Sequence, residues 1–473
     1  MKRSQAIGLA TGFVLFPSAS LADDAISVEQ RASLTQLVAE ASQAPETVGF
    51  SLAIARGGNV AYQAARGNRN LEPKAPATVE TWYCIGSVTK QFTAALIMQL
   101  VESHRLALDD KLATVLPAFP HAPEVTFRQL LSHTSGIIDY ADAVYAAGLN
   151  KQTNVQPAAL IALIAGKPLE STPGTVWEYS NSNYLALGLT IEKLYGKPYA
   201  QVLHERIAQP LGIEITAGTP PKGEPVARGY AAAVKPTPVE TADVSWAYAA
   251  GSIFATASAL LAWDRALFSG HVVNAESLAA MTTPVKLASG HPTDYGFGLS
   301  VANVQGRRLV LHTGGLPGFS AQNFVFPDDG IAIATLANTI DFNVVLPATK
   351  IADVLLPGVN AAVETLTKAR IAEMDDPAIR MRARDWLERL RTGKIDAGQL
   401  TSQMAAALTP SVLKNAASFL NAAGTVTGFK LTGFTHEGAY RVFTYTATTA
   451  TSQMVFSFTL DPQDKIAGLF LTP

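Results

Sequence analysis

Hydrophobic periodicity at the start of the chain predicts a helix followed by a β-hairpin. From Ile26 to Ala41, apolar residues recur every three or four positions, which is typical of an amphipathic helix. The run from Val48 to Ala55 predicts a strand, and Gly57-Gly58 predicts the turn into a second strand. A buried helix is predicted from Ser87 to Val101, and the prolines that follow break the chain into a helical middle region.

A second group of strands is predicted near residue 320. These strands are Arg308 to His312, Phe319 to Phe326 and Ile331 to Ala337, with turns at Gly314-Gly315 and Pro327 to Gly330. A helix from about Val344 to Leu356 is expected to end at Pro357-Gly358. The pattern predicts three antiparallel strands followed by a helix.

The last hundred residues have a different pattern, which predicts a small α+β domain. Helices are expected near Pro377 to Leu390 and Ala405 to Leu420, and four strands at Phe429 to Phe434, Tyr440 to Thr446, Met454 to Leu460 and Ile466 to Leu471. In the third strand, apolar residues from Met454 to Leu460 occupy every second position, as on one buried face of an antiparallel sheet.

Composition narrows the class of protein. The chain has 473 residues, of which 48% are apolar and 16% charged, so it is globular and long enough for more than one domain. Its formal net charge of -2 leaves no basic surplus for binding phosphates, so no nucleic-acid partner is expected.

The N-terminus resembles a secretory signal peptide, covering residues 1–22. Lys2 and Arg3 precede an apolar run that is shorter than the roughly 20 residues of a membrane-spanning helix. Ser20 and Ala22 supply small side chains for cleavage after Ala22. We therefore expect a secreted or periplasmic protein with no stable membrane anchor after cleavage.

The cysteine and histidine content argues against a metal site. Cys84 is the only cysteine, so neither an internal disulfide nor a thiolate metal site can form within the chain. Four histidines outside the motifs below have no partners at metal-ligand spacing (His104, His121, His271 and His291). No metal and no cofactor is expected.

The first candidate chemical motif is Ser87-x-x-Lys90. A spacing of three residues places both side chains on one face of a helix, where an uncharged lysine can accept the proton of a serine nucleophile. The motif is weak alone, because Ser411-x-x-Lys414 matches it in an ordinary surface helix.

Two further motifs follow at wide spacing. Tyr179-Ser180-Asn181 lies in a loop before a predicted helix, and its tyrosine could relay a proton if a neighbouring lysine lowers its pKa. His312-Thr313-Gly314-Gly315 ends a strand, where hydrogen-bond donors can face a substrate and glycines allow its backbone to approach closely.

In this order, the three motifs resemble those of the serine β-lactamase and D-Ala-D-Ala peptidase superfamily, particularly the class C β-lactamase, carboxypeptidase and esterase branch. The stretches Leu130 to Gly136 and Gly318-Phe319 support the likeness, which covers about residues 25–357. It implies an α+β fold: an antiparallel sheet flanked by helices, with an all-helical subdomain. The expected organisation is a hydrolase domain at 23–357, a linker at 358–369 and a small cystatin-like α+β domain at 370–473.

The resemblance implies a role for each motif residue. Ser87 would be the acylated nucleophile, Lys90 the base or its partner, and Tyr179 the proton relay to the leaving group. Asn181 would orient Lys90 and the substrate. His312, Thr313 and Gly314 would also bind the substrate. The backbone N–H groups of Ser87 and Gly315 would form the oxyanion hole. The expected partner is a small-molecule or peptide substrate, and the oligomeric state is left open.

One departure from the family pattern affects the expected substrate. The β-lactamases of this superfamily typically have lysine where His312 stands, and a histidine is only partly charged near neutral pH. We therefore favour a D-amino-acid peptidase, amidase or esterase over a class C-like β-lactamase. Two further hypotheses have less support in the sequence: a Ser-His-Asp site using His133 and Asp139, and a non-catalytic protein that binds a ligand or cell-wall peptide.

Overall fold

The computed structural model describes residues 26–45, 47–231, 236–239, 243–340, 342–437, 440–450, 452–461 and 463–472. The signal peptide expected at residues 1–22 therefore lies outside the described residues. Within the described part of the chain, no helix combines the length and the apolar character needed to cross a membrane.

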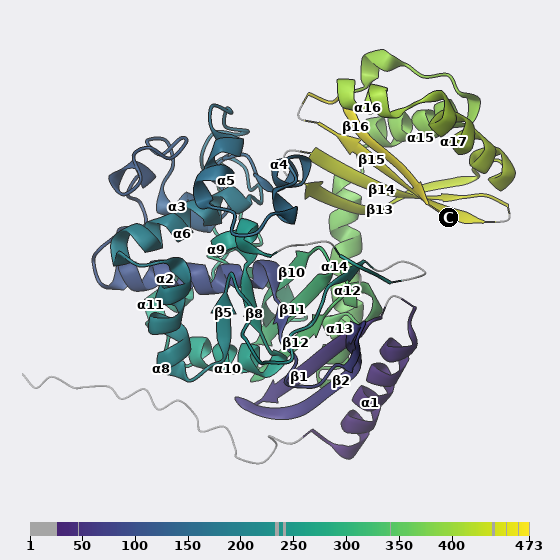
Figure 1. The fold of residues 1–473 in the computed structure, drawn as a ribbon. Coiled ribbons are helices and arrows are strands. Elements are labelled where there is room, and N and C mark those ends of the chain that lie inside the picture. Colours follow the sequence, from purple (N-terminus) through teal and green to yellow (C-terminus); the bar gives the residue numbers. More distant parts are fainter. Residues whose placement is uncertain are drawn as a thin grey trace, which may run out of the picture.

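A seven-stranded antiparallel sheet forms the centre of the molecule (Figure 1). Its order is β3-β2-β1-β12-β11-β10-β9, so the N-terminal hairpin pairs with strands from residues 300–337. The strands are β1 (Gly49–Arg56), β2 (Asn59–Leu71), β3 (Lys74–Pro76), β9 (Ser300–Val304), β10 (Arg307–Leu316), β11 (Phe319–Phe326) and β12 (Ile331–Ala337).

The two faces of this sheet bury two different hydrophobic clusters. On β1, Phe50 and Ile54 face a cluster that includes α1 (Val28–Gln43) and α13 (Ala348–Leu355), while Ala53 and Ala55 face the opposite cluster. The strand is buried along nearly its whole length because helices cover both faces. The second face packs against α10 (Ala257–Phe268) and the helix that begins beside Ser87.

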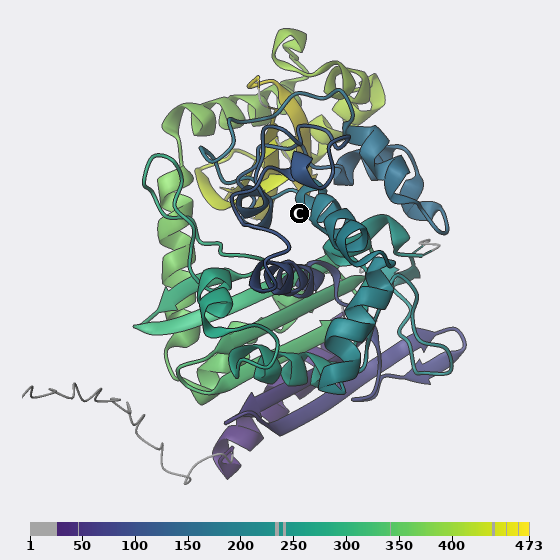
Figure 2. The ribbon, with the colours of Figure 1, turned by 90° about the vertical axis from the view of Figure 1, so that its left-hand side faces the viewer.

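The helical region lies on this second face. Its central helix is α2 (Thr89–Glu102), buried along almost all of its length and viewed nearly along its axis in Figure 2. The surrounding helices are α3 (Phe127–Leu131), α4 (Ala141–Ala146), α5 (Pro157–Ile164), α6 (Asn181–Tyr195), α7 (Tyr199–Leu203), α8 (Gln209–Leu211), α9 (Tyr248–Gly251) and α11 (Ala275–Met281). Short strands β4 (Tyr83–Cys84), β5 (Ile215–Ala217) and β8 (Ile253–Ala255) form a small sheet, and β6 (Tyr230–Ala231) pairs with β7 (Thr237–Pro238).

The C-terminal segment forms a separate four-stranded sheet, drawn in yellow and green at the top right of Figure 1. Its strands are β13 (Gly428–Glu437), β14 (Tyr440–Thr448), β15 (Gln453–Leu460) and β16 (Ile466–Thr472), and its helices are α15 (Pro377–Thr392), α16 (Ser402–Ala407) and α17 (Pro410–Ala423). Trp386 and the inward residues of β15 share one hydrophobic cluster. Met454, Phe456, Phe458 and Leu460 are buried, so the alternation predicted for this strand is confirmed.

Two predicted boundaries need correction. The turn expected at Gly314-Gly315 lies later, because β10 continues to Leu316 and pairs Gly315 with Ser320. The single helix expected at 344–356 is two helices, α12 (Phe342–Val345) and α13, because Pro347 precedes α13 and cannot donate a helical hydrogen bond. Residues 358–369, expected to link the two domains, lie mostly within the helix α14 (Val359–Met374).

Candidate active site

Ser87 and Lys90 meet at the start of α2. Ser87 lies in a 3₁₀ turn, Gly86–Val88, that leads directly into the helix, and Lys90 is in the first helical turn. Lys90 Nζ lies 3.1 Å from Ser87 Oγ, and the lysine side chain is fully buried. The contact predicted from the three-residue spacing is therefore present.

Two carbonyl oxygens hold the Lys90 amine in place. Nζ donates to Asn181 Oδ1 at 2.8 Å and to the backbone oxygen of Ala250 at 2.9 Å. Burial lowers the pKa of Lys90 to about 7, against the weaker opposing effect of the nearby Asp139 carboxylate. A neutral amine has two hydrogens and one lone pair. Since both hydrogens have carbonyl partners, the lone pair is left for the Ser87 hydroxyl.

Asn181 connects Lys90 to a buried carboxyl group. It is the first residue of α6, and its Nδ2 donates to Asp139 Oδ2 at 2.9 Å while its backbone N–H donates to Oδ1 at 3.1 Å. Burial raises the pKa of Asp139, although Lys90 and these hydrogen bonds act in the opposite direction. Asn181 thus orients Lys90, but its amide nitrogen faces Asp139 and is not directed to a substrate.

Tyr179 lies beside Lys90. The Lys90 Nζ atom is 4.7 Å from the centroid of the Tyr179 ring, and the buried tyrosine hydroxyl has no hydrogen-bond partner among the described residues. Burial raises the pKa of Tyr179 well above its ordinary value, whereas the Ser87 hydroxyl has a smaller opposite effect. The expectation that a neighbouring lysine lowers this pKa is therefore wrong for the unliganded site. Tyr179 is a neutral proton donor.

His133 supports the tyrosine and is not part of a catalytic triad. Its Nδ1 accepts the backbone N–H of Ser180 at 3.2 Å, and its ring centroid is 4.3 Å from that of Tyr179. Burial lowers the pKa of His133 well below its ordinary value. His133 therefore holds the backbone of the loop that carries Tyr179. Asp139, its partner in the alternative triad, bonds instead to Asn181.

His312 on β10 is buried and engaged at both ring nitrogens. Its Nδ1 lies 2.6 Å from the carbonyl oxygen of Thr313, so it must carry the proton that it donates. Its Nε2 lies 3.0 Å from the Tyr295 hydroxyl and accepts the hydroxyl proton. Burial lowers the pKa of His312 to about 3, so the ring is neutral at physiological pH. Sequence patterns did not identify Tyr295, which belongs to no motif and lies in an irregular segment.

Glycines allow β10 to approach the turn that holds Ser87. A Cβ on Gly314 would overlap the Ile85 carbonyl oxygen, and one on Gly86 would lie 2.8 Å from the Gly315 nitrogen. Ser87 and Gly315 consequently line the same cavity, which has a volume of about 350 Å³. Its other lining residues are Trp177, Tyr179, Tyr295, Ser300, Leu311, His312 and Thr313.

The motif residues therefore form two connected groups. Ser87 and Tyr179 lie between the cavity and the buried Lys90, and Asn181 lies behind Lys90. His312, Thr313 and Gly315, on β10, also line the cavity, while Gly314 packs against the backbone beside Ser87. The second Ser-x-x-Lys match, at Ser411, lies in α17 of the C-terminal segment. This arrangement offers an activated hydroxyl, a buried base and a neutral proton donor around one cavity.

Comparisons with known proteins show what this chain is similar to. Residues 34–355 match the family model described as Beta-lactamase. Penicillin-binding protein 4* of Bacillus subtilis is 29% identical over 302 residues, which cover 60% of this chain and 66% of that protein. The D-aminopeptidase of Brucella anthropi is 29% identical over 296 residues, covering 61% of this chain and 56% of that protein. The chain thus spans less than two thirds of the length of both relatives.

A solved structure supports the same fold. The D-amino acid amidase of Ochrobactrum anthropi SV3, in complex with L-phenylalanine amide, superposes with a TM-score of 0.61 at 25% identity. The alignment covers 71% of this chain and 99% of that one.

Proposed function

The chain belongs to the Beta-lactamase family, and on that premise we propose that it is an exported serine hydrolase. It acts through an acyl-enzyme on Ser87 and hydrolyses D-amino-acid peptides, D-amino-acid amides or esters. The observation that carries the proposal is the hydrogen bonding of Lys90, whose two carbonyl partners leave its lone pair for the Ser87 hydroxyl 3.1 Å away.

In the acylation step, Ser87 Oγ forms a bond to the substrate carbonyl carbon and its proton passes to Lys90 Nζ. The developing oxyanion is placed between the backbone N–H groups of Ser87 and Gly315, and each such donor contributes about 3 kcal/mol. The base is ready at neutral pH because burial brings the pKa of Lys90 to about 7.

Leaving-group departure requires a proton on the amine or alcohol that is expelled. Tyr179 is suited to this step because it stays protonated and its hydroxyl lies beside the Ser87 hydroxyl. It gives its proton to the leaving group and regains one from Lys90, whose Nζ lies over its ring. Water then attacks the acyl-enzyme, and the reverse proton transfers release Ser87.

The substrate class is supported by the relatives and by His312. The D-aminopeptidase and the D-amino acid amidase are similar to 61% and 71% of this chain, and the matched Beta-lactamase family region, residues 34–355, includes Ser87 and Lys90. A neutral histidine with both nitrogens engaged offers no cation for the carboxylate of a β-lactam. This favours a peptidase, amidase or esterase over a dedicated β-lactamase.

The test is covalent labelling with a fluorophosphonate, followed by intact-mass measurement of the protein and its Ser87→Ala variant. One adduct on the parent protein and none on the variant is the expected result. D-amino-acid amides, short esters and β-lactams would then be compared as substrates. A folded parent protein that takes up no label would reject the hydrolase and favour a ligand-binding protein.

A further inference from the structure

The cavity beside Ser87 contains no cation that is available to an anionic substrate group. Its nine lining residues include no lysine and no arginine. His312 is the one basic side chain among them, and its nitrogens are taken by the Thr313 carbonyl and the Tyr295 hydroxyl. A carboxylate held in this cavity would lose its hydration without gaining a charged partner, which is strongly unfavourable.

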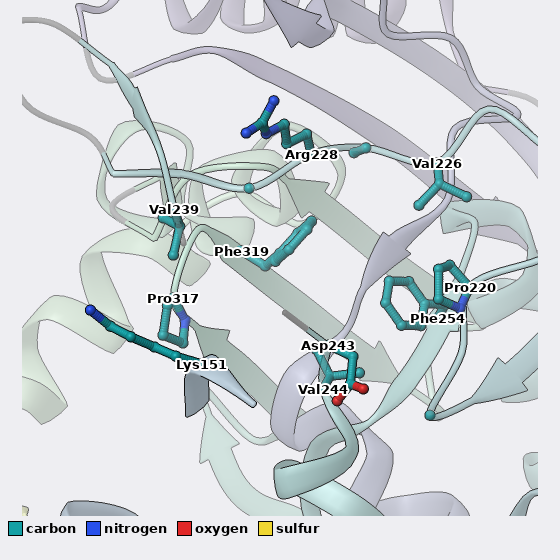
Figure 3. A pocket seen from close by; sticks show the side chains of 13 residues that line it. Lys151, Pro220, Val226, Arg228, Val239, Asp243, Val244, Phe254, Pro317 and Phe319 are labelled. Atoms are coloured by element: carbon teal, nitrogen blue, oxygen red, sulfur yellow. The ribbon is translucent and has the colours of Figure 1, made fainter. Parts of the chain in front are cut away.

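A second cavity, of about 500 Å³, lies beyond the turn that joins β10 to β11. Figure 3 shows the apolar side chains that line it, including Val226, Phe254, Pro317 and Phe319, with Arg228 and Lys151 at separate edges. The Arg228 side chain is exposed. Apolar walls with an exposed guanidinium at the rim suit a hydrocarbon or aromatic group that carries a carboxylate.

The acidic residue in this cavity is held by hydrogen bonds from neighbouring backbone and side-chain groups. Asp243 accepts the backbone N–H groups of Asn154 and Ser245 and the Ser245 hydroxyl, so both of its carboxylate oxygens are engaged. These bonds fix the loop around Asp243. The exposed Arg228 guanidinium remains available to an incoming anion, and charge-assisted hydrogen bonds to carboxylates are strong.

The second cavity lies close to the serine site along the strands that line both. Pro317 and Phe319 follow Gly315 by two and four residues, and two residues of extended strand span about 7 Å. Gly318 in the same turn packs so closely against Gly229, another lining residue, that a Cβ on it would lie 2.6 Å from the Gly229 Cα atom. Phe254 follows Ile253, whose carbonyl accepts the N–H of Ile85 beside the Ser87 turn.

We propose that this cavity is a subsite for the distal part of the acyl group, and that it selects acyl chains ending in a carboxylate. The chain would run from the carbonyl on Ser87 past Gly315, with its hydrocarbon part against Phe319 and Pro317 and its carboxylate at Arg228. The proposal rests on the proposed function, because it requires Ser87 to be acylated.

The test compares two esters matched in length, 4-nitrophenyl hexanoate and mono-4-nitrophenyl adipate, which differ in a terminal methyl against a terminal carboxylate. The parent protein should have the higher kcat/KM for the adipate ester. Arg228→Ala should lower kcat/KM for the adipate ester about tenfold and change that for the hexanoate less than about twofold. Arg228→Lys should recover part of the loss, since it retains the charge.

Lys222→Ala is the matched control, because Lys222 is an exposed cation in the same segment that does not line the cavity. It should leave the ratio of the two esters unchanged. A parent protein that prefers the hexanoate, or an Arg228→Ala protein with an unaltered ratio, would overturn the subsite. Failure of the proposed function gives a different result, in which neither ester is hydrolysed and Ser87 takes up no fluorophosphonate.

Discussion

Lys90 Nζ lies 3.1 Å from Ser87 Oγ and is held from behind by carbonyl oxygens of Asn181 and Ala250. Because all of these groups are in place without a substrate, little reorganisation is needed when the hydroxyl attacks. Asp139 extends this arrangement by holding Asn181 through both its side chain and its backbone. The protonation state of the Lys90 amine therefore controls the activation of Ser87 as a nucleophile.

Removing the amine should abolish activation of Ser87. Lys90→Met keeps an unbranched side chain without a base, and we expect the rate of fluorophosphonate labelling to fall about 10³-fold. The matched control is Lys414→Met, which alters the exposed lysine of the second Ser-x-x-Lys match. Intact-mass kinetics on both folded variants test this, and equal labelling rates would refute the assignment of the base.

Labelling should depend on pH through Lys90. A protonated amine cannot accept the serine proton, so the rate should rise with pH through the lowered pKa of about 7. Asp139→Asn removes the carboxylate that holds this pKa up, so the rising limb should move to lower pH. Asp328→Asn, at an exposed surface ion pair, serves as the control. If the labelling rate of Asp139→Asn rises over the same pH range as that of the parent protein, Asp139 does not raise the pKa of Lys90.

Gly314 should tolerate no side chain. A Cβ there would overlap the Ile85 carbonyl oxygen, so Gly314→Ala must displace β10 from the Ser87 turn and should destabilise the protein by about 3 kcal/mol. Gly196→Ala is the comparison, because nothing lies near its Cβ position and only its positive φ opposes the change, at about 1 kcal/mol. Urea unfolding of the two variants measures the difference. Equal losses of unfolding free energy in the two variants would mean that β10 can shift to make room for the added methyl group.

Asp264 should make stability depend on pH although it lies outside the serine site. Burial raises its pKa from 3.8 to about 8, while Asn323 Nδ2 donates to its Oδ2 at 2.7 Å. The folded protein therefore binds this proton more tightly than the unfolded chain does. The contribution of Asp264 to the free energy of unfolding is fully present below pH about 4 and is lost as the pH rises towards 8. Asp264→Asn should flatten this part of the profile in urea unfolding at pH 5, 6.5 and 8. An unchanged slope would show that Asp264 is ionised when folded.

The position of a C-terminal truncation should determine how stable the hydrolase part is. Val359, the first residue of α14, is fully buried in the cluster beneath the central sheet. Ending the chain after Pro357 removes that contact, whereas ending it after Met374 keeps α14 whole. We expect the longer form to label at Ser87 like the full chain and the shorter form to melt at a lower temperature. Loss of labelling in both forms would assign the C-terminal segment a part in the site.

Much of the fold could be predicted from local sequence patterns, because the alternation of apolar residues and the choice of turn residues depend only on neighbouring positions in the chain. The strand at Met454 to Leu460 is set by alternation, since each inward residue must be apolar whatever the neighbouring strands are. Element ends were predicted less well. β10 continues through Gly314 and Gly315 because pairing with β11 holds them in strand conformation, although the glycines alone suggested a turn.

The family, the Ser87 and Lys90 pair and the motifs around them could be identified from the sequence, because helical spacing and motif order depend only on positions along the chain. The charge states of the site residues, in contrast, depend on the folded structure. Burial makes Lys90 a base, keeps Tyr179 protonated and leaves His312 neutral against Tyr295. Dehydration of a side chain depends on everything packed around it, and Tyr295 and Asp139 reach the site from segments with no motif of their own. The cavity edged by Arg228 also exists only once distant loops are brought together.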